Sequence, residues 1–316
     1  MQTPSIFAPV SAPSEAIADY AALVIGICGA IFAVVVALIV VAMVRFRARA
    51  DDDGREPPQV YASNQIELAW TVLPILIVFV LGLVTARTIL ALQKDERPEG
   101  WLEVTAIGHQ WWWEFHYPEY DITTANELHI PLSQAEARRP TFLNLQSQDV
   151  IHSFWVPQLS GKTDVVPNRT NHMWMEPTQP GLYVGQCAEY CGTQHANMLL
   201  RVVVETRDEF ERWVERQQRP AVADASLADE RALFERTACI NCHQVRGTLA
   251  DGRFGPDLTH LMSRATLGSG VALNNRANLI DWIAHPDHLK PGARMPAMQL
   301  SPAQVERVAD YLVSLE

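Results

Sequence analysis

The chain has 316 residues, of which 48% are hydrophobic, and a formal net charge of −11 at pH 7. That length leaves room for two ordinary soluble domains together with membrane segments. The negative charge is concentrated in residues 95–225, which carry a net −9, whereas residues 1–94 and 226–316 carry −1 each. For a chain with this acidic balance we expect no nucleic-acid partner.

Two uncharged apolar runs near the start of the chain predict a transmembrane helical hairpin. The first run, residues 21–44, has 24 residues, and a helix of that length exceeds the hydrocarbon thickness of about 30 Å. The second run, residues 68–86, contains Pro74, which membrane helices tolerate. We therefore expect helices over about 17–44 and 66–92.

Arginines between the two runs set the expected orientation. No Lys or Arg precedes the first run, and the loop after it carries Arg45, Arg47, Arg49 and Arg55. The positive-inside rule places such a loop in the cytoplasm, so everything after about Leu92 lies outside. A cleaved signal peptide is the alternative for the first run, but a basic segment before it is missing. We expect a multi-pass protein of the bacterial inner membrane, with its large domains on the periplasmic or extracellular side.

The remainder of the chain changes character twice. Short stretches rich in β-forming residues, separated by Pro, Gly and Asn, predict a β-sandwich or barrel over residues 95–205. In residues 206–225 the sequence pattern predicts a charged helix followed by a short linker. Residues 226–316 predict an all-α domain whose last helix starts at Ser301-Pro302.

Five cysteines are present, and four of them form two close pairs that suggest ligands rather than a disulfide framework. Cys28, in the first apolar run, is expected to be a small packing residue. The first pair belongs to a cluster of two thiols, an imidazole and a thioether within twelve residues: Cys187, Cys191, His195 and Met198. Soft sulfur ligands beside imidazole favour copper. A zinc site and a disulfide are the alternatives, although zinc seldom takes Met. His152, at the end of a β-rich stretch, is the candidate second imidazole.

The second pair forms the motif Cys239-Ile240-Asn241-Cys242-His243. In a C-x-x-C-H motif the two thiols form thioethers with haem, and the adjacent His becomes an axial ligand. A thioredoxin-like C-x-x-C is the alternative, but it would need a βαβ pattern, which this segment lacks.

Residues 17–204 resemble subunit 2 of cytochrome c oxidase, in the haem-copper oxidase superfamily. Three motifs in family order carry the resemblance: Gly-His-Gln-Trp-Trp-Trp at 108–113, Asp-Val-Ile-His-Ser-Phe at 149–154, and the loop from Cys187 to Met198. The resemblance implies a cupredoxin-like β-barrel with a binuclear copper A centre. Its implied ligands are His152, Cys187, the backbone carbonyl of Glu189, Cys191, His195 and Met198.

The same resemblance assigns roles to three further side chains. It implies that Trp111 receives electrons from cytochrome c, with plain packing as the alternative. The carboxylate of Glu189 would reach a magnesium ion at the boundary with subunit 1, unless it is only an exposed loop carboxylate. Glu67 would lie near the entrance of a proton pathway, with a water-facing interfacial Glu as the alternative. We also expect Trp111–Trp113 to occupy consecutive strand positions, with at least one Trp in the core.

Residues 226–316 resemble a class I cytochrome c. A leading helix, the segment Phe-Gly-Pro-Asp-Leu at 254–258 and a closing helix carry that likeness. Met295, which precedes Pro296, is the expected sixth haem ligand because this context is usual for the distal methionine. The rivals are Met298, Met262, His285 and His288.

We therefore expect a fold of three parts: a transmembrane α-hairpin, a cupredoxin-like copper domain and an all-α cytochrome c domain. The chain would pass electrons from a soluble or membrane cytochrome c through haem c and copper A to subunit 1. Subunit 1 would supply haem a, the oxygen-reducing haem-copper centre and proton pumping, in contact with subunit 3 and membrane lipid. The alternatives are a subunit of a copper A nitric oxide reductase, a quinol oxidase subunit that has lost copper, and a membrane electron-storage protein.

Overall fold

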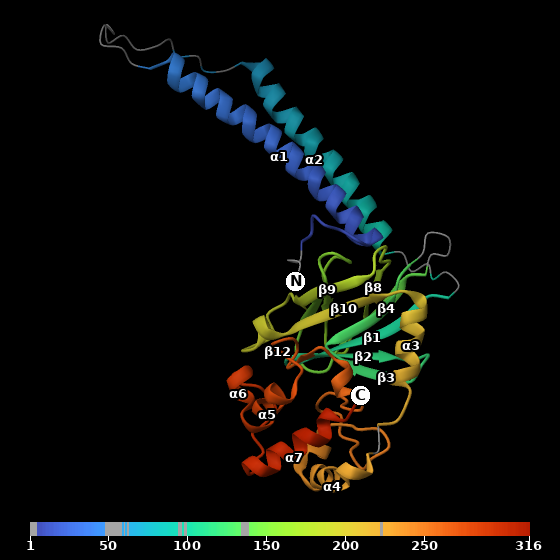
Figure 1. Cartoon of the computed structure of the whole chain (residues 1–316). Helices are drawn as coiled ribbons and strands as arrows, with labels where there is room; N and C mark the ends of the chain where they lie inside the picture. Colours follow the sequence, from blue (N-terminus) through green and yellow to red (C-terminus); the bar gives the residue numbers. More distant parts are fainter. Residues whose placement is uncertain are drawn as a thin grey trace. The chain divides into compact units, whose positions relative to one another are not determined.

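A computed structural model describes residues 5–47, 59, 61, 63–93, 97, 100–133, 139–221 and 224–316 (Figure 1). The chain divides into two compact units, one of residues 15–95 and one of residues 96–316 together with the first 14 residues.

The first unit consists of two long helices. Helix α1 spans Ala12–Arg45 and helix α2 spans Asn64–Leu92, and both are long and apolar enough to cross a membrane. Their apolar side chains are largely exposed, which suits a surface solvated by lipid. The hydroxyl groups of Tyr20 and Thr85 lie 2.6 Å apart and connect the two helices. Arg45 and Arg47 lie at the end of α1, whereas Arg49 and Arg55 fall outside the described residues.

The second unit begins with two five-stranded sheets, as the short stretches rich in β-forming residues predict. The first has the order β3 (Ile122–Ala125), β2 (Trp112–Tyr117), β1 (Leu102–His109), β5 (Thr141–Ser147) and β8 (Asn171–Met175). The second has the order β4 (Glu127–Pro131), β10 (Leu199–Glu205), β9 (Gly181–Cys187), β6 (His152–Trp155) and β7 (Thr163–Val165). Strands β1 and β5 pair in parallel, as do β4 and β10.

Large apolar side chains fill the space between the two sheets. Val104, Phe115, Leu128 and Phe154 are each 0% exposed, and the rings of Phe115 and Phe154 meet edge to face at 6.4 Å. Every second residue of β1 faces this core, because successive side chains of a strand point to opposite faces. The cupredoxin-like β-domain predicted from the sequence is therefore confirmed.

Helix α3 (Arg207–Gln217) closes the β-domain and leads to the helical domain. Thr206 caps its N-terminus in a reciprocal hydrogen-bond pair with Glu209. The buried ring of Trp213 stacks on His129 of β4 at 4.5 Å, which fixes the helix against the sheet.

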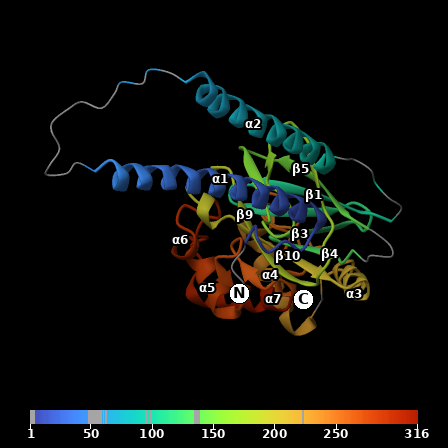
Figure 2. The same ribbon diagram turned by 90° about the horizontal axis from the view of Figure 1, so that it is seen from above.

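The last part of the chain is a helical domain, seen from two directions in Figures 1 and 2. Its elements are η2 (Ala225–Leu227), α4 (Ala228–Arg236), η3 (Ala238–Asn241), η4 (Leu261–Ser263), a short hairpin of β11 (Thr266–Leu267) and β12 (Ala272–Leu273), α5 (Arg276–Ala284), α6 (Pro286–Leu289) and α7 (Pro302–Val313). Phe234, Leu279 and Val308 form part of a separate apolar core. The last helix begins after Ser301, as expected, with the Ser301 hydroxyl accepting from Gln304.

Replacing Phe115 with Ala should destabilise the β-domain by about 3–5 kcal/mol, because it leaves a cavity in a fully buried core. Thermal or denaturant unfolding of the purified chain, followed by Trp fluorescence, measures this change. Leu182→Ala in β9 is the matched control, because Leu182 is 50% exposed and a surface change costs about 0.5 kcal/mol or less. Equal effects of the two substitutions would contradict the assignment of Phe115 to the core.

Candidate metal and haem sites

The ends of two neighbouring strands bring the first sulfur and nitrogen ligands together. His152 is the first residue of β6 and Cys187 is the last residue of β9. The two strands are antiparallel neighbours, with Phe154 opposite Cys187, so the His152 Nδ1 and Cys187 Sγ atoms lie 3.9 Å apart. Gly108 is needed beside them, because a Cβ at that position would lie 2.8 Å from the His152 ring.

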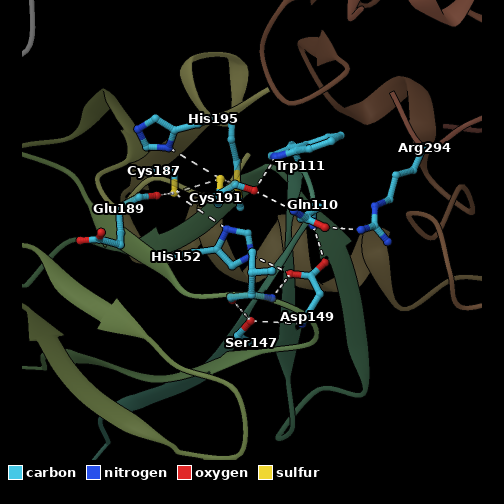
Figure 3. Close-up of polar contacts among 12 residues, drawn as sticks. Gln110, Trp111, Ser147, Asp149, His152, Cys187, Glu189, Cys191, His195 and Arg294 are labelled. Carbon is cyan, nitrogen blue, oxygen red and sulfur yellow. Dashed lines mark hydrogen bonds and ion pairs between the residues drawn. The ribbon is translucent and has the colours of Figure 1, made fainter. Parts of the chain in front are cut away.

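The loop between β9 and β10 supplies the remaining donors (Figure 3). Cys191 Sγ lies 3.8 Å from Cys187 Sγ, 3.6 Å from His195 Nδ1 and 3.8 Å from Met198 Sδ. The Cys187 thiol also faces the Glu189 carbonyl oxygen at 3.2 Å. The structure thus brings together all six residues expected from the sequence.

The two thiols are separate groups whose charges are coupled. A distance of 3.8 Å between Cys187 Sγ and Cys191 Sγ is far longer than the roughly 2.05 Å of a disulfide. The hydrogen bond between Cys187 and Cys191, aided by His152, lowers the pKa of Cys187, and the adjacent thiolate then raises the pKa of Cys191. Both sulfurs ionise together only beside a cation, because two adjacent thiolates repel each other. The donor set of two thiols, two imidazoles and a thioether therefore fits copper.

Asp149 orients the first imidazole, a role that the sequence analysis did not assign. Its Oδ1 lies 2.8 Å from His152 Nε2, and its Oδ2 accepts from the Gln110 backbone N–H at 2.7 Å. Burial works against charge on both side chains, but their mutual hydrogen bond outweighs it, so the pKa of His152 is raised and the pKa of Asp149 is lowered. This contact leaves Nδ1 of His152 facing Cys187. The spacing of three residues between Asp149 and His152 was the available signal.

The tryptophan run divides between the core and the site. Trp113 is 0% exposed, as the expectation of a core Trp requires. The expectation that all three lie in one strand is wrong for Trp111, because β2 begins at Trp112 and Trp111 belongs to the turn before it. From that turn the Trp111 indole Nε1 donates to the Cys191 carbonyl at 3.0 Å, and the Gln110 side-chain amide donates to the same oxygen at 2.7 Å.

Glu189 and Glu67 both have exposed side chains. The Glu189 carboxylate points away from the two sulfurs while its carbonyl faces them (Figure 3). Glu67 lies in the first turn of α2.

The C-x-x-C-H motif lies beside a cavity of about 910 Å³. Cys239, Cys242 and His243 line this cavity. His243 Nδ1 lies 2.8 Å from the Pro256 carbonyl, so Nδ1 carries the proton and Nε2 is left as the ligand atom. Burial lowers the pKa of His243 and keeps the ring neutral, as iron ligation requires. Gly255 packs directly against this ring, where a Cβ would lie 2.6 Å from Cε1.

The lining of the cavity distinguishes among the candidates for the sixth ligand. Met295 and Met298 line it, whereas Met262, His285 and His288 are absent from its lining as the described residues define it. Residues of the β-domain line the same cavity, among them His109, Trp111 and Trp112. The His109 and Trp112 rings stack at 4.2 Å. The haem-sized cavity is therefore shared between the two domains.

Comparisons with known proteins agree with this organisation. Residues 6–87 match the family model "Cytochrome C oxidase subunit II, transmembrane domain", residues 102–206 match "Cytochrome C oxidase subunit II, periplasmic domain", and residues 228–316 match "Cytochrome c". The chain is 37% identical to cytochrome c oxidase subunit 2 of Alkalihalophilus pseudofirmus over 290 residues, which cover 90% of this chain and 82% of that protein. It is 32% identical to cytochrome c oxidase subunit 2 of Bacillus sp. strain PS3, with coverage of 86% and 80%.

A solved structure, the periplasmic domain of subunit II of cytochrome oxidase of Bradyrhizobium japonicum, is 29% identical. The match covers 39% of this chain and 97% of that one, with a TM-score of 0.36.

Replacing Asp149 with Ala should weaken copper binding by about 10- to 100-fold, because the His152 ring loses the group that orients it. Competition with a copper chelator, with the purified chain, measures the affinity. Asp164→Ala is the matched control, since Asp164 is an exposed residue of β7. An affinity unchanged by Asp149→Ala would show that the contact does not support the ligand.

Proposed function

Because this chain belongs to the cytochrome c oxidase subunit 2 family, we propose that it relays electrons from a cytochrome c donor through its own haem c and copper A to subunit 1. The chain is one subunit of an oxygen-reducing oxidase, and it has a copper-type β-domain and a cytochrome c domain. The single observation that carries the proposed route is the Gln110–Trp111 turn, which contacts the copper loop on one side and lines the haem cavity on the other.

Six residues are proposed to hold two copper ions: His152, Cys187, the carbonyl of Glu189, Cys191, His195 and Met198. Copper bound there, like haem c, would take up and release one electron at a time. Two buried thiolates repel each other, and two bound cations would offset that repulsion. The exposed carboxylate of Glu189 remains free to reach a magnesium ion at the boundary with subunit 1.

The proposed haem site uses Cys239 and Cys242 for covalent attachment and His243 as one axial ligand. Met295 is the proposed second axial ligand, with Met298 as its rival, since both line the cavity. Trp111 is the proposed residue through which electrons enter the copper domain. Its indole N–H to the Cys191 carbonyl provides a direct contact with the copper loop.

The chain is a membrane protein with a periplasmic domain, and we propose the bacterial inner membrane as its location. Arg45 and Arg47 would face the cytoplasm. Glu67 would then lie at the cytoplasmic end of α2, beside the entrance of a proton pathway. Subunit 1 is the implied partner, and we propose further contacts with subunit 3, membrane lipid and a soluble or membrane cytochrome c. Nothing in the relatives favours a nitric oxide reductase, and their names are those of oxidase subunits.

Metal and haem analysis of the purified complex tests the proposal. We expect two copper ions and one haem c in this chain, a near-infrared copper band, and haem a from the partner. Cys191→Ser should remove the copper band and leave haem c, whereas Cys242→Ala should disturb haem attachment and leave the copper band. A wild-type complex that lacks copper would refute the function.

Ionic strength should affect reduction by an added cytochrome much more than electron transfer from haem to copper within the chain. Residues 95–225 carry a net −9, so reduction by an added basic cytochrome should fall steeply as salt screens the attraction. Transfer from haem to copper within the chain should change little, because the covalent connection keeps the two domains together. Stopped-flow measurements between low and physiological salt follow both rates. A steep salt dependence of the internal step would contradict this prediction.

A further inference from the structure

Lys290 of the helical domain is buried against the copper domain. It is 3% exposed. Its Nζ donates to the carbonyl oxygens of Trp111 at 2.6 Å, Asn197 at 2.9 Å and Gly268 at 2.9 Å. An ammonium group has three N–H donors, and all three are used here. Burial lowers the pKa of Lys290 to about 7. The three carbonyls accept from all three donors of the ammonium form and so define one position for the group.

The three carbonyls belong to functionally different segments. Trp111 lies in the turn that contacts the Cys191 carbonyl, and Asn197 lies between the proposed copper ligands His195 and Met198. Gly268 belongs to the helical domain and lines the haem cavity. One side chain therefore joins the copper loop, the Trp111 turn and the haem pocket.

Residues next to Lys290 make parallel contacts. The Gln194 amide donates to the Pro291 carbonyl, and Arg294 donates to the Gln110 side chain. Met295, the proposed sixth haem ligand, follows Arg294 directly. The segment 290–294 thus contacts the copper domain at Lys290, Pro291 and Arg294, and the proposed haem ligand Met295 follows it.

A second set of contacts fixes the other side of this interface. The buried carboxylate of Glu127 accepts from the backbone N–H groups of Ala265 and Thr266 at 2.9 and 3.0 Å. The backbone of Leu199, the first residue after Met198, exchanges hydrogen bonds with Ser269 at 3.2 and 2.6 Å. The haem domain is therefore held by buried, directional contacts in addition to its covalent connection.

We propose that Lys290 is a positioning residue for electron transfer within the chain, holding the Met295 segment in one fixed geometry against the Trp111 turn and the copper loop. This inference rests on the proposed function. The step moves one electron from ferrous haem to the oxidised copper pair, so the haem is oxidised as the copper pair is reduced, and no bond is made or broken. Lys290 does not carry the electron. It sets the distance and orientation over which the electron moves.

The test compares Lys290→Met with wild type in the purified oxidase complex. Methionine keeps an unbranched stem and removes the three donors. After pulse reduction of the haem, absorbance changes at haem and copper give the internal transfer rate. We expect Lys290→Met to slow this step by about tenfold or more, because small misplacements of reacting groups have large effects on rate. Lys162→Met, at an exposed position, is the matched control.

Copper and haem contents distinguish a failure of the proposed function from a failure of the role of Lys290. A wild-type chain without copper or haem c would refute the proposed function itself. A Lys290→Met chain with both centres, unchanged copper and haem spectra and a wild-type internal rate would overturn the role of Lys290. If Lys290→Met fails to retain its centres, Arg294→Met at an exposed position removes a neighbouring contact of the same segment. A slowed internal rate in that variant supports fixed docking, and a wild-type rate overturns it.

Discussion

Two buried sulfur atoms 3.8 Å apart are the constraint on which the rest of the copper domain depends. Two thiolates at that distance repel each other unless cations lie between or beside them. The protein must hold them there in a reproducible position, and a loop alone would not do so. Strands β6 and β9 provide the position, because their pairing places His152 and Cys187 at adjacent strand ends, and β10 anchors the other end of the loop immediately after Met198.

Much of this organisation could be predicted from the sequence because the strongest signals are local. The membrane helices follow from the length of the uninterrupted apolar runs. Both cysteine motifs can be recognised from their spacing without knowledge of the fold. The copper cluster was identified from one short loop plus His152. His152 was a candidate from its place at the end of a β-rich stretch, and the family resemblance then assigned it as a ligand, since nothing local in residues 149–154 shows that they lie beside residue 187.

The rest depends on tertiary geometry that one-dimensional patterns do not contain. Trp111 was expected to continue the strand of Trp112 and Trp113, yet a turn places it over the Cys191 carbonyl. Asp149 was part of a recognised motif, but its role follows only from the contact with His152. Lys290 carried no signal at all, because an isolated lysine in a polar segment predicts an exposed side chain. Its burial arises only where two separately predicted domains meet.

The shared cavity bears on how freely the haem domain could be exchanged. A conventional module carries its whole binding site within its own sequence and can be moved from one protein to another. Here part of the wall, His109, Trp111 and Trp112, belongs to the neighbouring domain. Grafting residues 226–316 onto a different carrier would leave that wall behind. The two domains therefore have to be engineered together, and a chimera must transfer the turn with Trp111 together with residues 226–316.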